Sequence, residues 1–303
     1  MRTLIAAACL ALTAACSDKV VTAPTVTVAE TQSPAPAAQS LAESATAGAP
    51  SAGDKAAAIL MQAVYGDSYR TATGDALAAL PNPDDRTAPM NFVVSPVAHS
   101  VLPSGDTVLV ANAEFAAEDG TAQSSHANGG LLNVYLMRQE GGQWKVLKRH
   151  ESVATLGSHG NLGTVQWVTL AEDKPGLAVL NGGTWQGYTV ENLALFDLTA
   201  DSMKELTVQH IPIHSDSDGG CDPEGDAQCW SVTGKWRFEP ARAAADYDDI
   251  VIDFSGQTSK GDPAGEGKPA GARVQNKVSG TARYAYDGKT YKLVEGANLV
   301  PEV

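Results

Sequence analysis

The chain has 303 residues, of which 43% are hydrophobic and 18% charged, and its formal net charge is −14. A chain of this length and apolar content can bury a core, which excludes disorder throughout. The acidic excess argues against a general nucleic-acid-binding protein, because contacts to phosphates need a basic surface.

The N-terminus predicts a secretory signal peptide over residues 1–15. Met1 and Arg2 give a positively charged start, and residues 3–15 are uncharged and mostly apolar. This apolar stretch is shorter than the roughly 20 residues that a membrane-spanning helix needs, and no later stretch is long and apolar enough to span a bilayer. The sequence therefore predicts export and no transmembrane helix.

The signal ends in Leu12-Thr13-Ala14-Ala15-Cys16, which resembles the lipobox of bacterial lipoproteins. The resemblance implies that Cys16 is acylated and becomes the first residue of the mature protein. Such a lipid anchor fixes a domain to a membrane surface without spanning it. In that family Ser17, in place of Asp, implies sorting to the outer membrane, so the expected location is its periplasmic face. The alternative is a plain secretory signal with an incidental cysteine.

Two segments separate the signal from the rest of the chain. Residues 16–53 are mostly Ala, Pro, Ser and Thr and hold no aromatic residue, so we expect a disordered tether that buries too little apolar surface to fold. Residues 54–90 are expected to be a short helical segment. In this segment Asp54 caps a helix that Gly66 ends, and a second helical turn follows at residues 75–80.

Residues 91–303 consist of short β-rich runs separated by Gly, Pro, Asn and Asp, which indicates strands joined by turns. One order of four strands occurs three times, about every 70 residues, and Asp287-Gly288 is a strong hairpin signal. We therefore predict an all-β fold with a short N-terminal helix, a propeller-like array of about three four-stranded antiparallel units, with a β-sandwich as the alternative. The expected strands are residues 91–94, 107–110, 132–136 and 144–147, then 165–168, 177–180, 193–196 and 205–208, then 235–238, 250–254, 282–286 and 291–294.

Two segments of the β-rich region resemble degenerate blades of the FG-GAP/VCBS-type β-propellers. They are residues 167–179 (WVTLAEDKPGLAV) and residues 246–252 (DYDDIVI). The resemblance implies a propeller-type domain. The family usually carries a calcium-binding Asp-x-Asp-Gly-Asp-Gly motif in this hairpin, and neither segment has it. The resemblance therefore does not predict calcium at these two places.

Cys221 and Cys229 are the only cysteines of the predicted folded region. In an oxidising envelope compartment, an even pair close in the sequence predicts a disulfide. Closing so short a loop would stabilise the fold by roughly 2.5 kcal/mol.

An acidic stretch surrounds the first of these cysteines and holds no basic residue. Carboxylates on a Gly-rich loop are ligands that Ca²⁺ prefers, which makes Asp216, Asp218, Asp222 and Glu224 a candidate calcium site and calcium the one candidate cofactor. Their spacing does not fit an EF-hand, and the alternative is a solvated acidic loop held by its disulfide.

Histidines offer weaker candidates for a metal site. His210 and His214 can point to one face of an extended segment, but Pro212 and the missing third ligand argue against zinc. His159 is expected to be a turn residue, because glycines flank it closely.

The most distinctive local sequence is NGGTWQGY at residues 181–188. It is expected to be a connecting loop between two strands of the middle unit. Large aromatic side chains among glycines suit an anchor presented to a partner, so Trp185, Gln186 and Tyr188 form a candidate partner-binding loop. Alternatively, Trp185 and Tyr188 fold back over the sheet as a small satellite core.

The search for enzymatic chemistry finds no nucleophile elbow, zinc-protease motif or phosphate-binding loop. The leading hypothesis is therefore an envelope-anchored lipoprotein that acts as a non-enzymatic binding module for another envelope or secreted protein, such as an inhibitor or immunity protein against a cell-wall hydrolase. One alternative is a structural component of an envelope assembly. The other is a carbohydrate-active hydrolase, whose carboxylate pair would come from Asp246, Asp248, Asp249 and Asp253.

Overall fold

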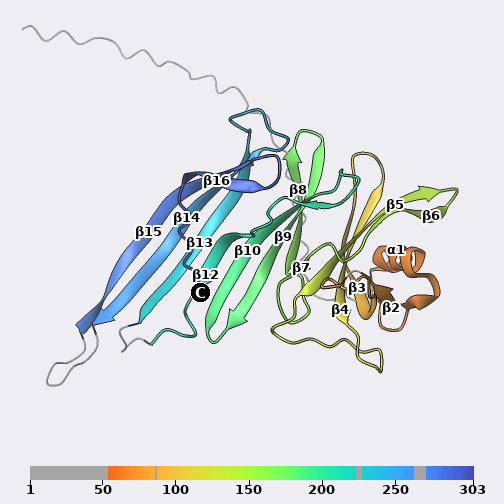
Figure 1. The fold of residues 1–303 in the computed structure, drawn as a ribbon, viewed down its shortest axis with the longest axis horizontal. Helices are drawn as coiled ribbons and strands as arrows, with labels where there is room; N and C mark the ends of the chain where they lie inside the picture. The colour runs from red at the N-terminus through yellow and green to blue at the C-terminus, as the bar shows by residue number, and fades with distance from the viewer. Residues whose placement is uncertain (1–53, 86, 223–226, 263–270) are drawn as a thin grey trace, which may run out of the picture. The chain divides into compact units, whose positions relative to one another are not determined.

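The computed structural model describes residues 54–85, 87–222, 227–262 and 271–303, which belong to one compact unit of the chain (Figure 1). The predicted signal peptide, Cys16 and the predicted tether lie outside the described residues. No helix among the described residues is long and apolar enough to cross a membrane. The first elements are α1 (Lys55–Tyr65), a 3-10 turn (Gly66–Ser68), β1 (Tyr69–Arg70), β2 (Asp75–Leu80), β3 (Met90–Val101), β4 (Thr107–Phe115), β5 (Gly130–Glu140), β6 (Gln143–His150) and β7 (Thr155–Leu156). The later elements are β8 (Thr164–Ala171), β9 (Lys174–Trp185), β10 (Tyr188–Asp197), β11 (Lys204–Glu205), β12 (Ile211–Asp216), β13 (Gln228–Glu239), β14 (Asp249–Asp262), β15 (Gly271–Tyr286) and β16 (Tyr291–Gly296).

The predicted N-terminal helix is confirmed as α1. The Asp54 carboxylate accepts hydrogen bonds from the backbone N–H groups of Ala56 and Ala57, at 3.0 and 3.1 Å. The helix ends at Gly66, which has a positive φ of 55° and donates its N–H to the carbonyl oxygen of Gln62. The helix is therefore capped at both ends by the residues expected from the sequence, Asp54 and Gly66.

The second expected helical turn, at residues 75–80, is wrong, because these residues form strand β2. The strand pairs antiparallel with β3, with Ala76 opposite Val94. Ala76 and Leu80 are buried, and Leu77 between them is exposed. Alternating burial is the period of a strand with one face on a core, and it overrides the weak helical preference of this alanine-rich stretch.

The strands form two antiparallel sheets. The first has the order β1-β2-β3-β4-β5-β6, and β7 pairs with β5. The second has the order β16-β15-β14-β13-β12-β10-β9-β8, and β11 pairs with β10. In both sheets, neighbours along the chain are mostly neighbours in space.

The all-β prediction is confirmed, and the expected strands of the first and third units pair in the expected order. In the second unit the expected strand at residues 205–208 is wrong beyond Glu205, because β11 spans only Lys204–Glu205. The hairpin predicted at Asp287-Gly288 joins β15 to β16. The second and third units, however, belong to a single sheet, because β12 pairs with β10 on one side and β13 on the other. A three-unit propeller is not confirmed, and the β-sandwich alternative fits these two sheets equally well.

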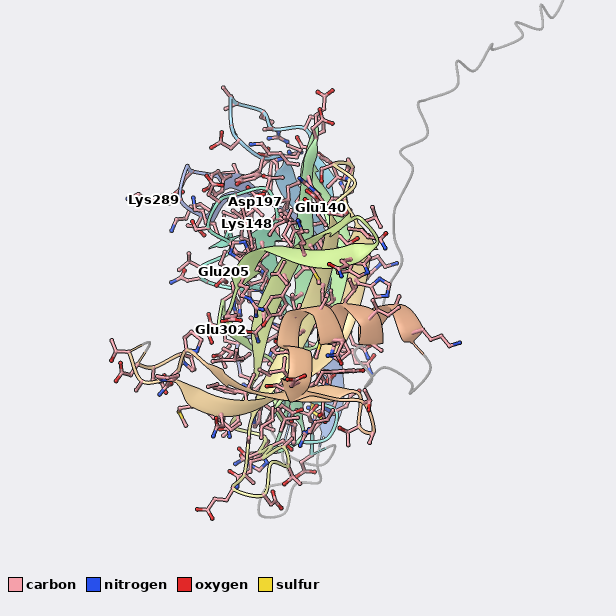
Figure 2. All side chains as sticks on the ribbon, turned by 90° about the vertical axis from the view of Figure 1, so that its right-hand side faces the viewer. Glu140, Lys148, Asp197, Glu205, Lys289 and Glu302 are labelled. Atoms are coloured by element: carbon pink, nitrogen blue, oxygen red, sulfur yellow. A yellow bond between two sulfur atoms is a disulfide. The ribbon has the colours of Figure 1, made fainter. Side chains whose placement is uncertain are left out.

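Three apolar clusters show how the layers pack. Helix α1 covers one face of the first sheet (Figure 2), where Leu60, Met61 and Val64 contact a cluster that includes Tyr135 and Met137. The opposite face of this sheet packs against strands β8 to β10 in a second cluster. The third cluster lies on the other face of the second sheet. Each sheet therefore has apolar side chains on both faces, which accounts for the long apolar runs in β4, β5, β9 and β10.

Candidate functional site

Residues 185–188, which we call the aromatic tip, form the end of the β9–β10 hairpin. Gln186 and Gly187 are the two turn residues, and both have positive φ, 50° and 86°. Positive φ at both central residues is the mark of a type I′ turn, whose twist matches the strands that it joins. The expected Gly-rich connecting loop is therefore a tight hairpin, and the glycines Gly182 and Gly183 lie within β9 opposite Glu191 and Val190.

The two aromatic residues of the tip have different surroundings. The Trp185 side chain is 36% exposed, although it is one of the largest apolar side chains of the protein. Tyr188 is half-buried, and its ring stacks on the Trp230 ring with centroids 5.6 Å apart and planes 26° apart. Tyr188 thus packs on another ring, as in the satellite-core alternative, whereas Trp185 is partly covered, with its ring beside Gly183, and partly open to solvent.

The aromatic tip packs against residues 217–222 and 227–230, which we call the disulfide segment. The N–H of Gly219 donates to the carbonyl oxygen of Gly187 over 3.0 Å. A Cβ atom at Gly187 would collide with the backbone of Gly219 and Gly220, and one at Gly220 would touch the Tyr188 ring. Close backbone approach of this kind needs glycine on both sides.

The predicted disulfide is confirmed between Cys221 and Cys229, whose Cα atoms are 5.5 Å apart. It closes a loop with a sequence separation of eight, directly beside the residue on which Tyr188 stacks. The disulfide thereby ties the segment that contacts the aromatic tip to strand β13 of the second sheet.

Trp230 and Arg273 are two residues of this region that the sequence did not single out. The Trp230 indole N–H donates to the Ser215 hydroxyl over 2.8 Å. The Arg273 guanidinium donates to the carbonyl oxygens of Asp222 and Ala227, at 2.8 and 2.6 Å, and contacts the Sγ atom of Cys229. Trp230 could have been found, because it directly follows a predicted disulfide cysteine. Arg273 could not, since it is distant in the sequence and belongs to no motif.

The calcium site at Asp216, Asp218, Asp222 and Glu224 stays a prediction. Asp216 accepts from the Asp218 N–H and pairs with the His214 ring at 3.0 Å, and Asp222 contributes its main-chain oxygen to Arg273. Glu224 lies outside the described residues. No group of three or more His, Cys, Asp or Glu side chains that could hold a metal occurs in the part of the chain that the structure describes.

The histidines singled out for zinc lie apart in separate pairs. His210 pairs with Glu205 at 3.1 Å, whereas His214 pairs with Asp216. His159 has a positive φ of 53°, which agrees with its expected place in a turn, and its ring meets that of His126 edge to face at 5.6 Å.

The turn before His159 reaches the base of the aromatic tip. The Ser158 hydroxyl donates to the carbonyl oxygen of Gly182 over 3.0 Å. A Cβ atom at Gly183 would touch both the Ser158 hydroxyl and the Trp185 ring. The absence of a side chain at Gly183 therefore lets Trp185 lie against the sheet beside Ser158.

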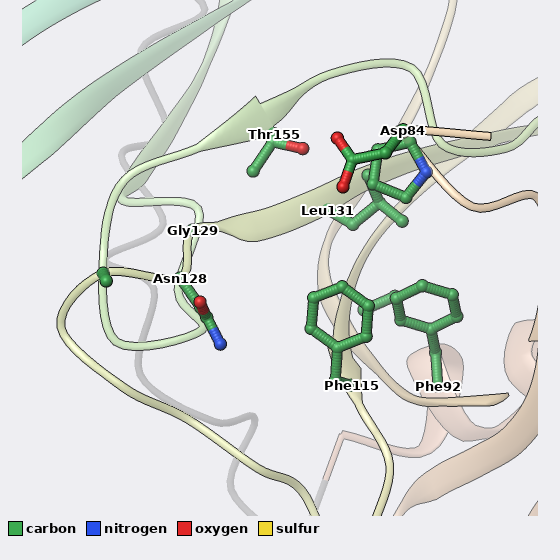
Figure 3. Close-up of a pocket in the computed structure, with 10 residues that line it drawn as sticks. Asp84, Phe92, Phe115, Asn128, Gly129, Leu131 and Thr155 are labelled. Atoms are coloured by element: carbon green, nitrogen blue, oxygen red, sulfur yellow. The ribbon is translucent and has the colours of Figure 1, made fainter. Parts of the chain in front are cut away.

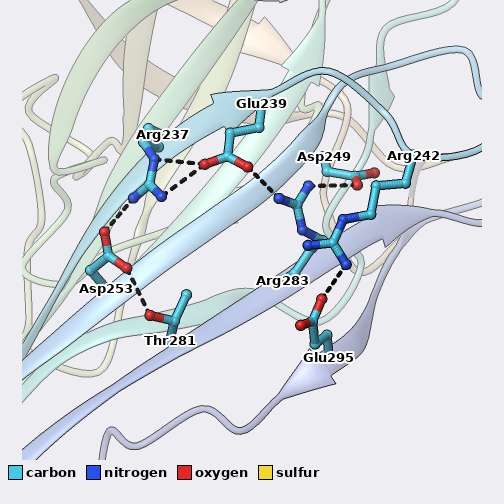
Figure 4. A network of polar contacts seen from close by, with 8 residues as sticks. All are labelled: Arg237, Glu239, Arg242, Asp249, Asp253, Thr281, Arg283 and Glu295. Carbon is cyan, nitrogen blue, oxygen red and sulfur yellow. Dashed lines mark hydrogen bonds and ion pairs between the residues drawn. The ribbon is translucent and has the colours of Figure 1, made fainter.

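Two of the aspartates considered for a hydrolase belong to a network of arginines and carboxylates on the second sheet (Figure 4). Arg283 donates to Asp249 over 2.9 Å and also contacts Glu239. Arg237 donates to Glu239 over 2.8 Å and contacts Asp253, which also accepts from the Thr281 hydroxyl at 2.8 Å. These contacts cross strands β13, β14 and β15.

The electrostatics of this network do not suit acid catalysis. Hydrogen bonds from Thr281 and Arg237 hold the pKa of Asp253 below its usual range. Hydrogen bonds from Arg237 and Arg283 hold the pKa of Glu239 below its usual range. A catalytic general acid needs a raised pKa. Of the remaining aspartates, Asp248 accepts a hydrogen bond from the Tyr291 hydroxyl with its main-chain oxygen. Asp246 accepts one from the Lys174 ammonium, also with its main-chain oxygen.

A pocket of about 170 Å³ lies on the first sheet, beside the rings of Phe92 and Phe115, whose centroids are 5.0 Å apart (Figure 3). Asp84, Asn128 and Thr155 supply its polar atoms. A second pocket of about 280 Å³ lies among Leu102, Leu136 and Leu198. Neither pocket is lined by a residue that the sequence singled out, and both hold too few convergent polar groups to indicate a reaction.

The arrangement around the aromatic tip is therefore the best candidate site. It offers an exposed indole on a rigid turn, next to Asp216, Asp218 and Asp222 and backed by a disulfide. Such a surface can bind a partner through the Trp185 ring. Comparison of the chain with family models, curated proteins and solved structures found no match.

Proposed function

We propose that the protein is a non-enzymatic binding module that presents the aromatic tip to another protein. The observation that carries the proposal is the exposed Trp185 on a turn held by Gly219, Gly220 and a disulfide. Tryptophan is enriched among the residues that dominate binding energy. Because the tip is held in place before binding, little conformational entropy is lost when a partner covers it.

The charge of the site supports a basic partner. Asp216, Asp218 and Asp222 lie in or next to the disulfide segment, and the whole chain carries a net charge of −14. An acidic surface speeds association with basic patches and disfavours acidic partners. A cell-wall hydrolase with a basic surface is a concrete partner, and the protein would then act as its inhibitor or immunity protein.

The envelope location is part of the same proposal and is supported by the sequence Leu12-Thr13-Ala14-Ala15-Cys16. A lipid on Cys16 would place the binding module at the periplasmic face of the outer membrane. The three-unit propeller also stays a proposal, supported by the repeated order of strands. The apolar layer between the first sheet and strands β8 to β10 supports the sandwich.

The proposal is tested by measuring how the protein slows peptidoglycan cleavage by purified basic cell-wall hydrolases, and which envelope proteins it retains. Trp185→Ala is expected to weaken both effects by about thirtyfold, because a buried hot-spot side chain contributes about 2 kcal/mol or more. Val208→Ala is the matched control, since Val208 is 68% exposed and away from the tip.

Unchanged inhibition and retention in the Trp185→Ala variant would contradict the role of the aromatic tip. Cleavage of peptidoglycan by the protein itself would contradict the non-enzymatic assignment.

A further inference from the structure

Strand β15 leaves a long backbone edge open at the margin of the second sheet. On one side β15 pairs with β14 along nearly its whole length. On the other side β16 pairs only with residues from Ala282 to Tyr286 (Figure 1). Among the described residues, no strand covers the stretch from Gly271 to Thr281 on this side. Because every second residue of an edge strand turns its N–H and C=O groups outward, this stretch is a template for another strand.

Among the exposed described side chains of this edge, Lys277 is the one charge that works against such pairing. Gln275, Asn276 and Lys277 are exposed, and Val274 is 64% exposed. The edge contains no proline, which is a common device against edge-to-edge association. An incoming strand would cover Val274 and satisfy the outward backbone groups.

The sequence of the edge is close to a palindrome. Residues 273–279 read Arg-Val-Gln-Asn-Lys-Val-Ser. Around Asn276, a valine stands two residues away on each side, and a polar residue stands one and three residues away on each side. Asn276 is also the midpoint of the open stretch from Gly271 to Thr281.

We propose that two copies of this chain pair antiparallel through their β15 edges, with Asn276 on the two-fold axis. Opposed residues of an antiparallel pair share a face, so a two-fold pairing always sets one residue opposite its own copy. With Asn276 in that place, Val274 packs on Val278 of the second copy, and Gln275 faces Lys277. The two nine-stranded sheets then continue into each other.

Pairings centred one residue to either side of Asn276 are less stable. A pairing centred on Gln275 sets Arg273 opposite Lys277 in two places, and one centred on Lys277 sets this residue opposite its own copy. Like charges directly opposite each other destabilise a sheet. The register centred on Asn276 avoids both oppositions and uses the whole open edge up to the first residue that β16 covers. The surface is therefore complementary to itself.

The test measures dimerisation of the full chain by sedimentation equilibrium. The chain carries Cys9→Ser and Cys16→Ser, so that neither the predicted lipid nor an N-terminal thiol takes part. Gln275→Lys sets two lysines opposite each other twice and is expected to raise the dissociation constant about tenfold, and Gln275→Glu is expected to lower it. Ser255→Lys is the control, since this exposed residue on β14 pairs with Ser279 and lies away from the edge.

A cysteine scan tests the register separately. Asn276→Cys is expected to cross-link two copies under mild oxidation, because opposed residues have Cα atoms about 4.5 or 5.5 Å apart, within the range of a disulfide. Ser255→Cys should not cross-link. A chain that stays monomeric at high concentration would overturn the proposal. So would a dimer equally stable in the Gln275→Lys and Ser255→Lys variants, or an Asn276→Cys variant that does not cross-link.

Discussion

At the scale of single residues, Gly187 shows how one backbone position holds the aromatic tip. Its φ of 86° lies in the region that side chains disfavour, and its Cα packs against the backbone of Gly219 and Gly220. Gly288 has a similar φ of 92° but open space around it. The two glycines separate the effect of backbone conformation from the effect of close packing.

Gly187→Ala is expected to lower the free energy of unfolding by about 3 kcal/mol, because strain and a backbone collision add. Gly288→Ala should cost about 1 kcal/mol, from strain alone. Urea unfolding of both variants measures the difference. Equal losses would show that the tip does not depend on its contact with the disulfide segment.

A second effect at this scale is the pH dependence that Arg237 gives to the network of Figure 4. The folded pKa values of Glu239 and Asp253 lie below their ordinary values of 4.5 and 3.8. The stabilisation is therefore full above the unfolded pKa values and is lost as the pH falls through the lower, folded ones.

Arg237→Gln is expected to lower stability at neutral pH and to lose this effect in acid, where both carboxylates are protonated. Arg242→Gln is the control, because Arg242 and its partner Glu295 are 62% and 58% exposed and such pairs contribute little. Thermal unfolding between neutral pH and about pH 2.5 follows the difference. A constant effect of Arg237→Gln over this range would show that the arginine acts through packing instead of charge.

At the scale of elements, the disulfide joins the segment that follows β12 to the start of β13 and supports the β9–β10 hairpin. Removing it with Cys221→Ser and Cys229→Ser is expected to lower the free energy of unfolding by about 2.5 kcal/mol. The same variant should bind a partner more weakly, because the support of Tyr188 is loosened. Cys9→Ser with Cys16→Ser is the control for unfolding. An unchanged urea midpoint would contradict a stabilising role.

Much of the element structure could be predicted from the sequence, for stated reasons. The cap Asp54, the stop Gly66 and the hairpin Asp287-Gly288 are local signals, and each acts within a few residues. Alternation and turn residues placed the expected strands of the first and third units and the first three strands of the second. Residues 75–80 were misassigned because six residues rich in alanine carry too little periodicity to separate a helical turn from a strand.

The parts that could not be predicted depend on contacts between distant residues. The union of the second and third units rests on β12, where Pro212 and His214 weaken the strand pattern. The support of the aromatic tip rests on Trp230, Gly219 and Arg273, and no spacing in the sequence links them. For the candidate site, the sequence identified the exposed Trp185 and the disulfide, whereas the packing of Tyr188 needed the fold.

At the scale of the whole molecule, the proposed lipid anchor on Cys16 can be tested by its effect on location. Cys16→Ser is expected to release the protein from the membrane fraction into the soluble periplasmic fraction, because the proposed acyl chains would no longer be attached. Cell fractionation and mass spectrometry of the mature N-terminus measure this. Cys9→Ser is the control. Membrane association that persists in the Cys16→Ser variant would contradict the lipoprotein assignment.

The two sheets also have a consequence for the order in which the protein folds. The first sheet uses only residues from Tyr69 to Leu156, and the second uses only residues from Thr164 to Gly296. During vectorial synthesis or export, the first sheet and α1 can assemble before the second is complete. Until strands β8 to β10 arrive, Val108, Val110 and Leu132 on its other face have no cover. The apolar face of this first half is then open to water and prone to aggregation until strands β8 to β10 cover it.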